Sequence, residues 1–109
     1  MVGSREYKDE YLYLTTIGRN SGKPHEIEIW YVKHGLCYYL IAEHREQAHW
    51  VKNIQQNQDI SFRVHGEIFK GTGRSVDAIN ETKLVRLVAD LMQAKYQWSD
   101  GLVVELCPE

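Results

Sequence analysis

The sequence has little cysteine, no excess of basic residues and no long apolar run, and each shortage excludes a class of protein. The formal net charge is −2 over 109 residues, so no overall positive field attracts nucleic acid. The longest apolar stretch, around residues 36–42, falls far short of the roughly 20 residues that a membrane-spanning helix needs. We therefore expect a soluble protein with no nucleic-acid partner and no membrane span.

The two cysteines, Cys37 and Cys107, lie far apart and form no Cys-x-x-Cys pair, so the sequence contains neither a metal knuckle nor a redox dithiol of that type. Neither has the basic, helix-start surroundings that favour a reactive thiolate. The first ten residues are polar and mixed in charge, unlike a signal peptide. We expect reduced thiols without a chemical role, and a cytoplasmic location.

What the sequence does contain is alternating apolar and polar residues, rich in aromatic and β-branched types, which is typical of β-strands. The predicted strands are residues 11–16, 25–32, 36–42, 60–64, 68–76 and 102–106. Short breaks that contain glycine indicate two hairpins, one between the second and third strands and one between the fourth and fifth.

Two segments have helical spacing instead. Residues 46–57 carry Ala48, Val51 and Ile54 on one face without glycine or proline, and a longer helix begins near the candidate caps Asp77 and Asn80 and reaches about residue 96. This order of elements predicts an α+β, mostly β fold, with about six antiparallel strands in a sheet or barrel and two packed helices. The length suits a single domain over residues 1–109.

The loop after the first strand is the most informative segment for function. Gly18 and Gly22 allow the backbone to approach a ligand closely, and Arg19, Ser21 and Lys23 add side-chain donors for an anionic group. These features suit a phosphate site. An ordinary hairpin turn with solvated charges has the same composition, and the loop alone does not separate the two interpretations.

Three motifs resemble a known family. They are Leu-Thr-Thr-Ile-Gly-Arg-Asn-Ser-Gly-Lys-Pro at 14–24, followed by a Trp-Tyr strand; Trp-Val-Lys-Asn at 50–53; and Phe-x-Gly-x-x-Arg at 69–74. In this order they resemble the deazaflavin-dependent nitroreductase and quinone reductase family. The resemblance covers roughly residues 12–76 and is weaker through the last helix and strand.

The resemblance implies a split β-barrel related to the pyridoxamine phosphate oxidase fold, usually dimeric. It implies an oxidoreductase that transfers hydride between the deazaflavin coenzyme F420, or alternatively flavin mononucleotide (FMN), and a small conjugated acceptor such as a quinone or a nitroaromatic. A second hypothesis is a non-catalytic carrier or sensor of the same cofactor, since a fold alone does not fix a function.

The resemblance also implies cofactor-binding residues, although it identifies no catalytic residue. The loop residues Arg19, Asn20, Ser21, Gly22 and Lys23 would hold the phosphate, and His25, just after the loop, is also expected to bind the cofactor. Ile27, Glu28 and Ile29 would line the ring through backbone contacts, and Trp50, Lys52 and Asn53 would border the pocket.

Several positions depart from the family pattern. His25 stands where the family has an arginine after the loop, Glu28 stands where it has a strand proline, and Glu-His-Arg-Glu-Gln at 43–47 replaces a Ser-x-Gly-Gly segment. These departures bear on the choice between F420 and FMN. We expect no metal site at 43–49, because His44 and His49 miss the three- or four-residue spacing that places two ligands on one helical face.

Overall fold

The computed structural model describes residues 10–109, and its first strand has the alternation that the sequence predicts. In β1 (Tyr11–Ile17), the side chains of Leu12, Leu14 and Thr16 are buried and those between them are half-buried. β1 pairs on one side with β2 (Pro24–Trp30) and on the other with β5 (Asp59–Val64). This strand therefore connects the first hairpin to the rest of the sheet.

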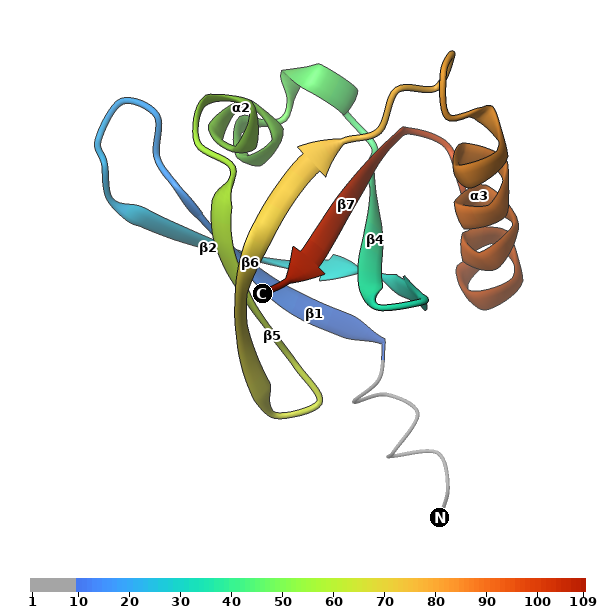
Figure 1. The fold of residues 1–109 in the computed structure, drawn as a ribbon, viewed down its shortest axis with the longest axis horizontal. Coiled ribbons are helices and arrows are strands. Elements are labelled where there is room, and N and C mark those ends of the chain that lie inside the picture. The colour runs from blue at the N-terminus through green and yellow to red at the C-terminus, as the bar shows by residue number, and fades with distance from the viewer. Residues whose placement is uncertain (1–9) are drawn as a thin grey trace.

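The remaining elements follow in chain order. They are β3 (Val32–His34), β4 (Cys37–Ala42), the 3-10 turn η1 (Arg45–Gln47), α2 (His49–Gln56), β5, β6 (Glu67–Ser75), α3 (Thr82–Tyr96) and β7 (Leu102–Pro108). The strands form one seven-stranded sheet in the order β2-β1-β5-β6-β7-β4-β3, with every pair antiparallel. The sheet curls so that β2 contacts β4, as Figure 1 shows. The predicted α+β, mostly β split barrel with two helices is confirmed.

The described residues form seven strands rather than six because the predicted strand 25–32 divides at Tyr31. Its first part pairs with β1 and its last part, β3, pairs with β4. At the break, the amide of Tyr31 donates to the hydroxyl oxygen of Tyr96 at 3.1 Å. The hydrogen of the same hydroxyl is within reach of two carbonyls, that of Glu10 at 2.5 Å and that of Tyr31 at 2.9 Å. A side chain of α3 thus takes the place of a neighbouring strand at this residue.

Apolar side chains fill both faces of the sheet. Inside the barrel, Leu12, Leu40 and Phe62 pack with Ile54 of α2. On the other face, Ile41 belongs to a second cluster that includes residues of α3. Since β4 sends alternate side chains into both clusters, its continuous apolar run is that of a strand covered on both sides. No helix among residues 10–109 is long and apolar enough to span a membrane.

Both predicted helices form, with changes at their beginnings. The predicted helix 46–57 is a 3-10 turn followed by α2, and the two are separated by Ala48, which has extended backbone angles. The prediction that Asp77 and Asn80 cap α3 is wrong. Asp77 accepts the amides of Ile79 and Asn80 at 2.9 and 3.2 Å and closes a turn before the helix, whose N-cap residue is Glu81.

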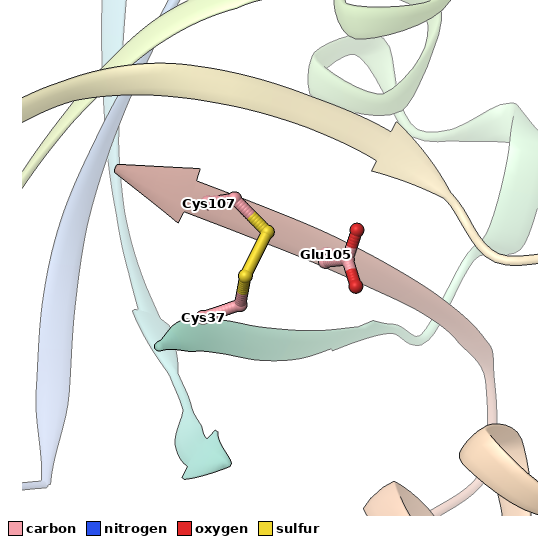
Figure 2. Close-up of side chains that lie close together, drawn as sticks. All are labelled: Cys37, Glu105 and Cys107. Carbon is pink, nitrogen blue, oxygen red and sulfur yellow. A yellow bond between two sulfur atoms is a disulfide. The ribbon is translucent and has the colours of Figure 1, made fainter. Parts of the chain in front are cut away.

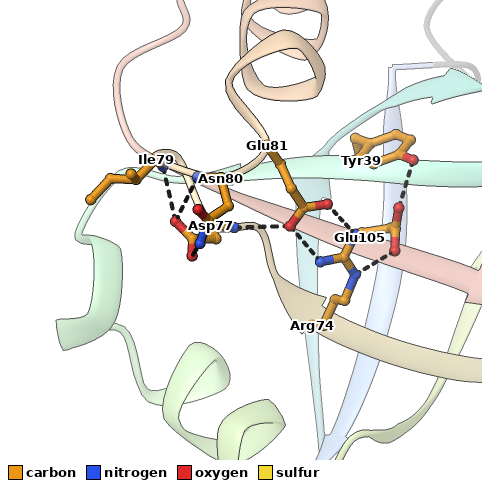
Figure 3. A network of polar contacts seen from close by, with 7 residues as sticks. All are labelled: Tyr39, Arg74, Asp77, Ile79, Asn80, Glu81 and Glu105. Carbon is orange, nitrogen blue, oxygen red and sulfur yellow. Dashed lines mark hydrogen bonds and ion pairs between the residues drawn. The ribbon is translucent and has the colours of Figure 1, made fainter.

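A polar network joins this turn to the sheet (Figure 3). Arg74 donates to both carboxylate oxygens of Glu81 and, through Nε, to Glu105, each at 2.8 Å. These bonds lower the pKa of Glu81. The hydroxyl of Tyr39 donates to the other oxygen of Glu105 at 2.7 Å, and burial together with this bond raises the pKa of Tyr39 to about 12. The network therefore ties the start of α3 to β4, β6 and β7.

The prediction of two separate, reduced thiols is wrong, because Cys37 and Cys107 form a disulfide (Figure 2). Cys37 begins β4 and Cys107 lies near the end of β7, each one position beyond the paired residues Tyr38 and Leu106. Antiparallel pairing places such residues opposite each other with their side chains on the same face. The sequence could not reveal this, since 70 positions separate the two cysteines.

We predict that replacing both cysteines (Cys37→Ser with Cys107→Ser) lowers the free energy of unfolding by about 4 kcal/mol, because the bond closes a long loop and restricts the unfolded chain. Urea denaturation without reductant measures the difference. The wild-type protein in excess dithiol should approach the stability of the double variant. Equal stability of the variant and the oxidised wild type would contradict the disulfide.

Candidate functional site

A cleft of about 590 Å³ lies beside β2 and the end of β4. Its lining residues come from five parts of the chain: Tyr11, residues 27–30, residues 41–44, Ala48 with Trp50, and Trp98. All three tryptophans of the protein, Trp30, Trp50 and Trp98, are among them. Aromatic walls of this kind suit a flat, conjugated ligand, which stacks on or between rings.

The C-terminal end of α3 fixes one wall of the cleft. The ring of Trp30 stacks on Tyr96 with centroids 4.5 Å apart and planes 7° apart, and it meets the ring of Trp98 edge-on at 6.0 Å. Burial raises the pKa of the Tyr96 hydroxyl, so this group stays protonated and can donate to the carbonyls of Glu10 and Tyr31 that face it. The Trp30 ring is therefore held in place by packing and by a hydrogen-bonded neighbour.

β2 supplies a second wall and lies at an edge of the sheet. Backbone N–H and C=O groups on the open side of an edge strand have no partner in the sheet. Ile27 and Ile29 are half-buried against the barrel core, whereas Glu26 and Glu28 are exposed. Glu26 forms an ion pair with Arg63 at 3.4 Å, and Glu28 lines the cleft. The strand thus offers backbone groups and apolar side chains to a ligand.

Most backbone amides of the loop from Gly18 to Lys23 already donate hydrogen bonds within the protein. Gly18 donates to the carbonyl of Lys23 and Gly22 to that of Gly18, both at 2.8 Å, while the amide of Lys23 donates to the hydroxyl of Ser21 at 3.1 Å. A side chain at position 18 would require the exposed side chains of Ser21 and His25 to move. Within residues 10–109, the loop amides without an acceptor are those of Asn20 and Ser21.

Asn53 connects this loop to α2. Its side-chain oxygen accepts from the backbone amide of Arg19 at 3.2 Å and from the guanidinium of Arg19 at 2.9 Å. Its amide group donates to the hydroxyl of Thr16 at 3.1 Å. Asn53 is 4% exposed and Thr16 is 1% exposed, so these bonds satisfy groups that water does not reach.

Positive side chains around the loop are not neutralised by acids. Arg19 donates to the side-chain oxygen of Asn53 and to the backbone carbonyl of His49, and in the part of the chain that the structure describes no carboxylate forms an ion pair with Arg19, Lys23 or Lys52. Such cations attract phosphate. Arg45 differs, because it forms an ion pair with Asp100 at 3.1 Å.

The structure distributes the predicted site residues between two places. Ile27, Glu28, Ile29 and Trp50 line the cleft, whereas Lys52, Asn53, His25 and the loop residues Arg19, Asn20, Ser21, Gly22 and Lys23 do not. Asn53 holds the loop rather than bordering the cleft. The sequence analysis missed Trp98, which no local motif signals because it reaches the cleft only through the packing of α3, and Trp30, whose Trp-Tyr motif was noted without a role.

The sequence model of the F420H(2)-dependent quinone reductase family matches residues 1–104. No curated protein matches the sequence.

Solved structures share the fold. The heme storage protein HutZ of Vibrio cholerae superposes with a TM-score of 0.75 at 18% identity, over 99% of this chain and 87% of that chain. An F420-H2 dependent reductase superposes with a TM-score of 0.65 at 18% sequence identity, over 89% of this chain and 93% of that chain. An FAD-binding protein of Mesorhizobium loti superposes with a TM-score of 0.70 at 13% sequence identity, over 100% of this chain and 91% of that chain. At these identities the likeness shows the fold alone.

We predict that Asn53→Ala lowers the free energy of unfolding by roughly 2–4 kcal/mol, because it leaves the amide of Arg19 and the hydroxyl of Thr16 without their buried partner. Urea denaturation measures the loss. Gln55→Ala, at an exposed position of the same helix, is the matched control and should change stability by about 0.5 kcal/mol or less. A similar effect of both substitutions would show that the Asn53 bonds contribute little.

Proposed function

Since the chain belongs to the F420H(2)-dependent quinone reductase family, we propose that it transfers hydride between the deazaflavin F420 and a small conjugated acceptor such as a quinone or a nitroaromatic. The observation that carries this proposal is the cleft, in which three tryptophan side chains and an edge strand meet.

The residues of the cleft fit a tricyclic ring with one polar edge. The side chains of Trp50, Trp98 and Ile29 give apolar walls for the faces of the ring. The unpaired backbone groups of β2 near Ile27 and Glu28 give donors and acceptors for a ring edge that carries amide-like groups. When bound, the deazaflavin supplies the hydride, and the chain's residues bind it, orient it and exclude water from one face.

The charged tail of the cofactor has a suitable partner in the loop. Arg19 and Lys23 are positive and have no acidic partner within residues 10–109. Asn53 fixes the first of them beside α2, the helix that also carries Trp50. The two regions therefore share one helix, with the ring site at its beginning and the phosphate site one turn later. We propose that loop side chains, with the amides of Asn20 and Ser21, bind the phosphate.

Three further parts of the proposal concern the setting of the protein. We propose a homodimer, which is consistent with the fold that the chain shares with a domain-swapped dimer (TM-score 0.66, 20% identity), and a cytoplasmic location. FMN is the alternative cofactor, because it has the same kind of flat ring and needs fewer positive partners.

A carrier or sensor is the second candidate function, and the heme storage protein of the same fold favours it. Turnover separates the two. We expect the purified protein to accelerate the oxidation of F420H2 by an added quinone under anaerobic conditions. The return of the absorbance of oxidised F420 measures the rate. Tight binding of F420 without any acceleration by quinones or nitroaromatics would favour the carrier.

Reversing one charge tests the phosphate site. We predict that Lys23→Glu weakens F420 binding at least tenfold, because a carboxylate would then face the phosphate. A titration of tryptophan fluorescence with F420, and separately with FMN, measures the affinity. Lys83→Glu, the same reversal at an exposed position of α3, should leave it unchanged. Equal affinities of the Lys23→Glu variant and the wild type would remove the loop from the site.

A further inference from the structure

Four side chains outside the cleft form a small cluster on one face of the sheet. Cys37 and Tyr39 lie two positions apart on β4, and Glu105 and Cys107 lie two positions apart on β7. Tyr39 pairs directly with Glu105, and residues in this arrangement point to the same side of a sheet. The ligand atoms of Cys37, Glu105 and Cys107 all lie within 4.8 Å of one another (Figure 2).

Two sulfurs and a carboxylate at this spacing are a ligand set for a thiophilic divalent cation. Zn²⁺ binds thiolates at about 2.3 Å and carboxylates at about 2.0 Å in tetrahedral geometry, so its ligand atoms lie roughly 3.3–3.8 Å apart. In the oxidised cluster the two sulfurs are 2.01 Å apart, and a carboxylate oxygen of Glu105 lies within 4.8 Å of both. Once the sulfur–sulfur bond is broken, small side-chain rotations bring all three ligands to one ion.

The carboxylate of Glu105 is already oriented by its neighbours. One oxygen accepts from the hydroxyl of Tyr39 and the other from Nε of Arg74. Each carboxylate oxygen has two lone pairs, so one lone pair on each remains for a metal. The charge of Arg74 is also balanced by Glu81, which it contacts through both terminal nitrogens. Hydrogen bonds of this kind to a ligating carboxylate are a regular feature of metal sites.

The cluster is neither sealed nor fully open. Cys37, Glu105 and Cys107 are half-buried, and the side chain of Glu105 is 15% exposed. An ion therefore has a path to the ligands, and the site is dry enough for charged ligands to bind it firmly.

We propose that the disulfide is one of two states of this cluster, and that in the reduced state Cys37, Cys107 and Glu105 bind a divalent cation of the Zn²⁺ class. A dithiol reductant transfers two electrons and two protons to the disulfide and is itself oxidised to a disulfide. Metal binding then releases both thiol protons, forms two metal–sulfur bonds and one metal–oxygen bond, and leaves the fourth position to water. The start of β4 and the end of β7 stay cross-linked in either state.

This proposal does not depend on the redox function of the cleft, since none of its ligands lines the cleft. It gives the protein a cross-link in a reducing compartment as well as in an oxidising one. The disulfide is the cross-link under oxidising conditions, and the bound metal is the cross-link where thiols stay reduced.

The test uses the full-length protein, reduced anaerobically with a dithiol, freed of reductant by desalting and titrated with Co²⁺. We expect one Co²⁺ per chain, with the charge-transfer absorption of thiolate–cobalt bonds and the visible bands of tetrahedral cobalt. Added Zn²⁺ should displace it and raise the urea midpoint of the reduced protein. The oxidised protein, with its sulfurs bonded to each other, should not bind Co²⁺ in this way.

Two variants assign the ligands. The double variant with Cys37→Ser and Cys107→Ser should lose the charge-transfer band. Glu105→Gln, which keeps the shape of the side chain, should weaken Co²⁺ binding at least tenfold. Glu67→Gln, at the exposed start of β6, is the control and should bind as the wild type does.

Three results would overturn the proposal: no Co²⁺ uptake by the reduced protein, equal uptake by the oxidised protein, or an unchanged affinity in Glu105→Gln. Circular dichroism of the reduced, metal-free protein covers the case in which reduction unfolds the chain. Refolding on addition of one equivalent of Zn²⁺ would then support the site, and failure to refold would contradict it.

Discussion

The barrel depends on hydrogen bonds that α3 makes to the backbone of Tyr31, chiefly through the hydroxyl of Tyr96. The predicted strand 25–32 has to serve two neighbours, because its first part pairs with β1 and its last part with β4 at the far edge of the sheet. The chain can change partners only if the residue between them finds other hydrogen bonds. The hydroxyl of Tyr96 accepts the amide of Tyr31 and lies against the carbonyls of Tyr31 and Glu10. The ammonium group of Lys95 donates to the Tyr31 carbonyl at 3.0 Å.

The same tyrosine connects the fold to the cleft. Its ring stacks on Trp30, and Trp98, two residues beyond the end of α3, also lines the cleft. The position of the aromatic cleft is thus a consequence of how the barrel closes. The 18–23 loop is positioned separately, through the buried side chain of Asn53, and α2 is the element common to the loop and the cleft.

Local pattern was sufficient to predict most of the strands, both helices and the family. Alternation along β1 and the three- and four-residue spacing in α3 are properties of the elements themselves. The sequence did not reveal features that depend on contacts between distant segments. The break at Tyr31 needs Tyr96, and the disulfide needs the β4–β7 pairing.

In the candidate site, too, some residues were predictable from the sequence and others depend on contacts between distant segments. The resemblance pointed to Ile27, Ile29 and Trp50, which the structure places in the cleft, and to Asn53, whose side chain is instead occupied with Arg19 and Thr16. Of the six loop amides that the sequence offered to a phosphate, three are bonded within the loop and that of Arg19 is bonded to Asn53. Side chains therefore have the larger part in the proposed phosphate site, which the glycine pattern alone did not indicate.

The most direct test of the central claim is the response of the three indole N–H signals in a ¹H–¹⁵N correlation spectrum as F420 is added. All three tryptophans line the cleft, so binding of the ring there should shift every indole signal together. If backbone amides of the 18–23 loop shift while all three indole signals stay unchanged, the ring does not occupy the cleft and the account of its function is wrong.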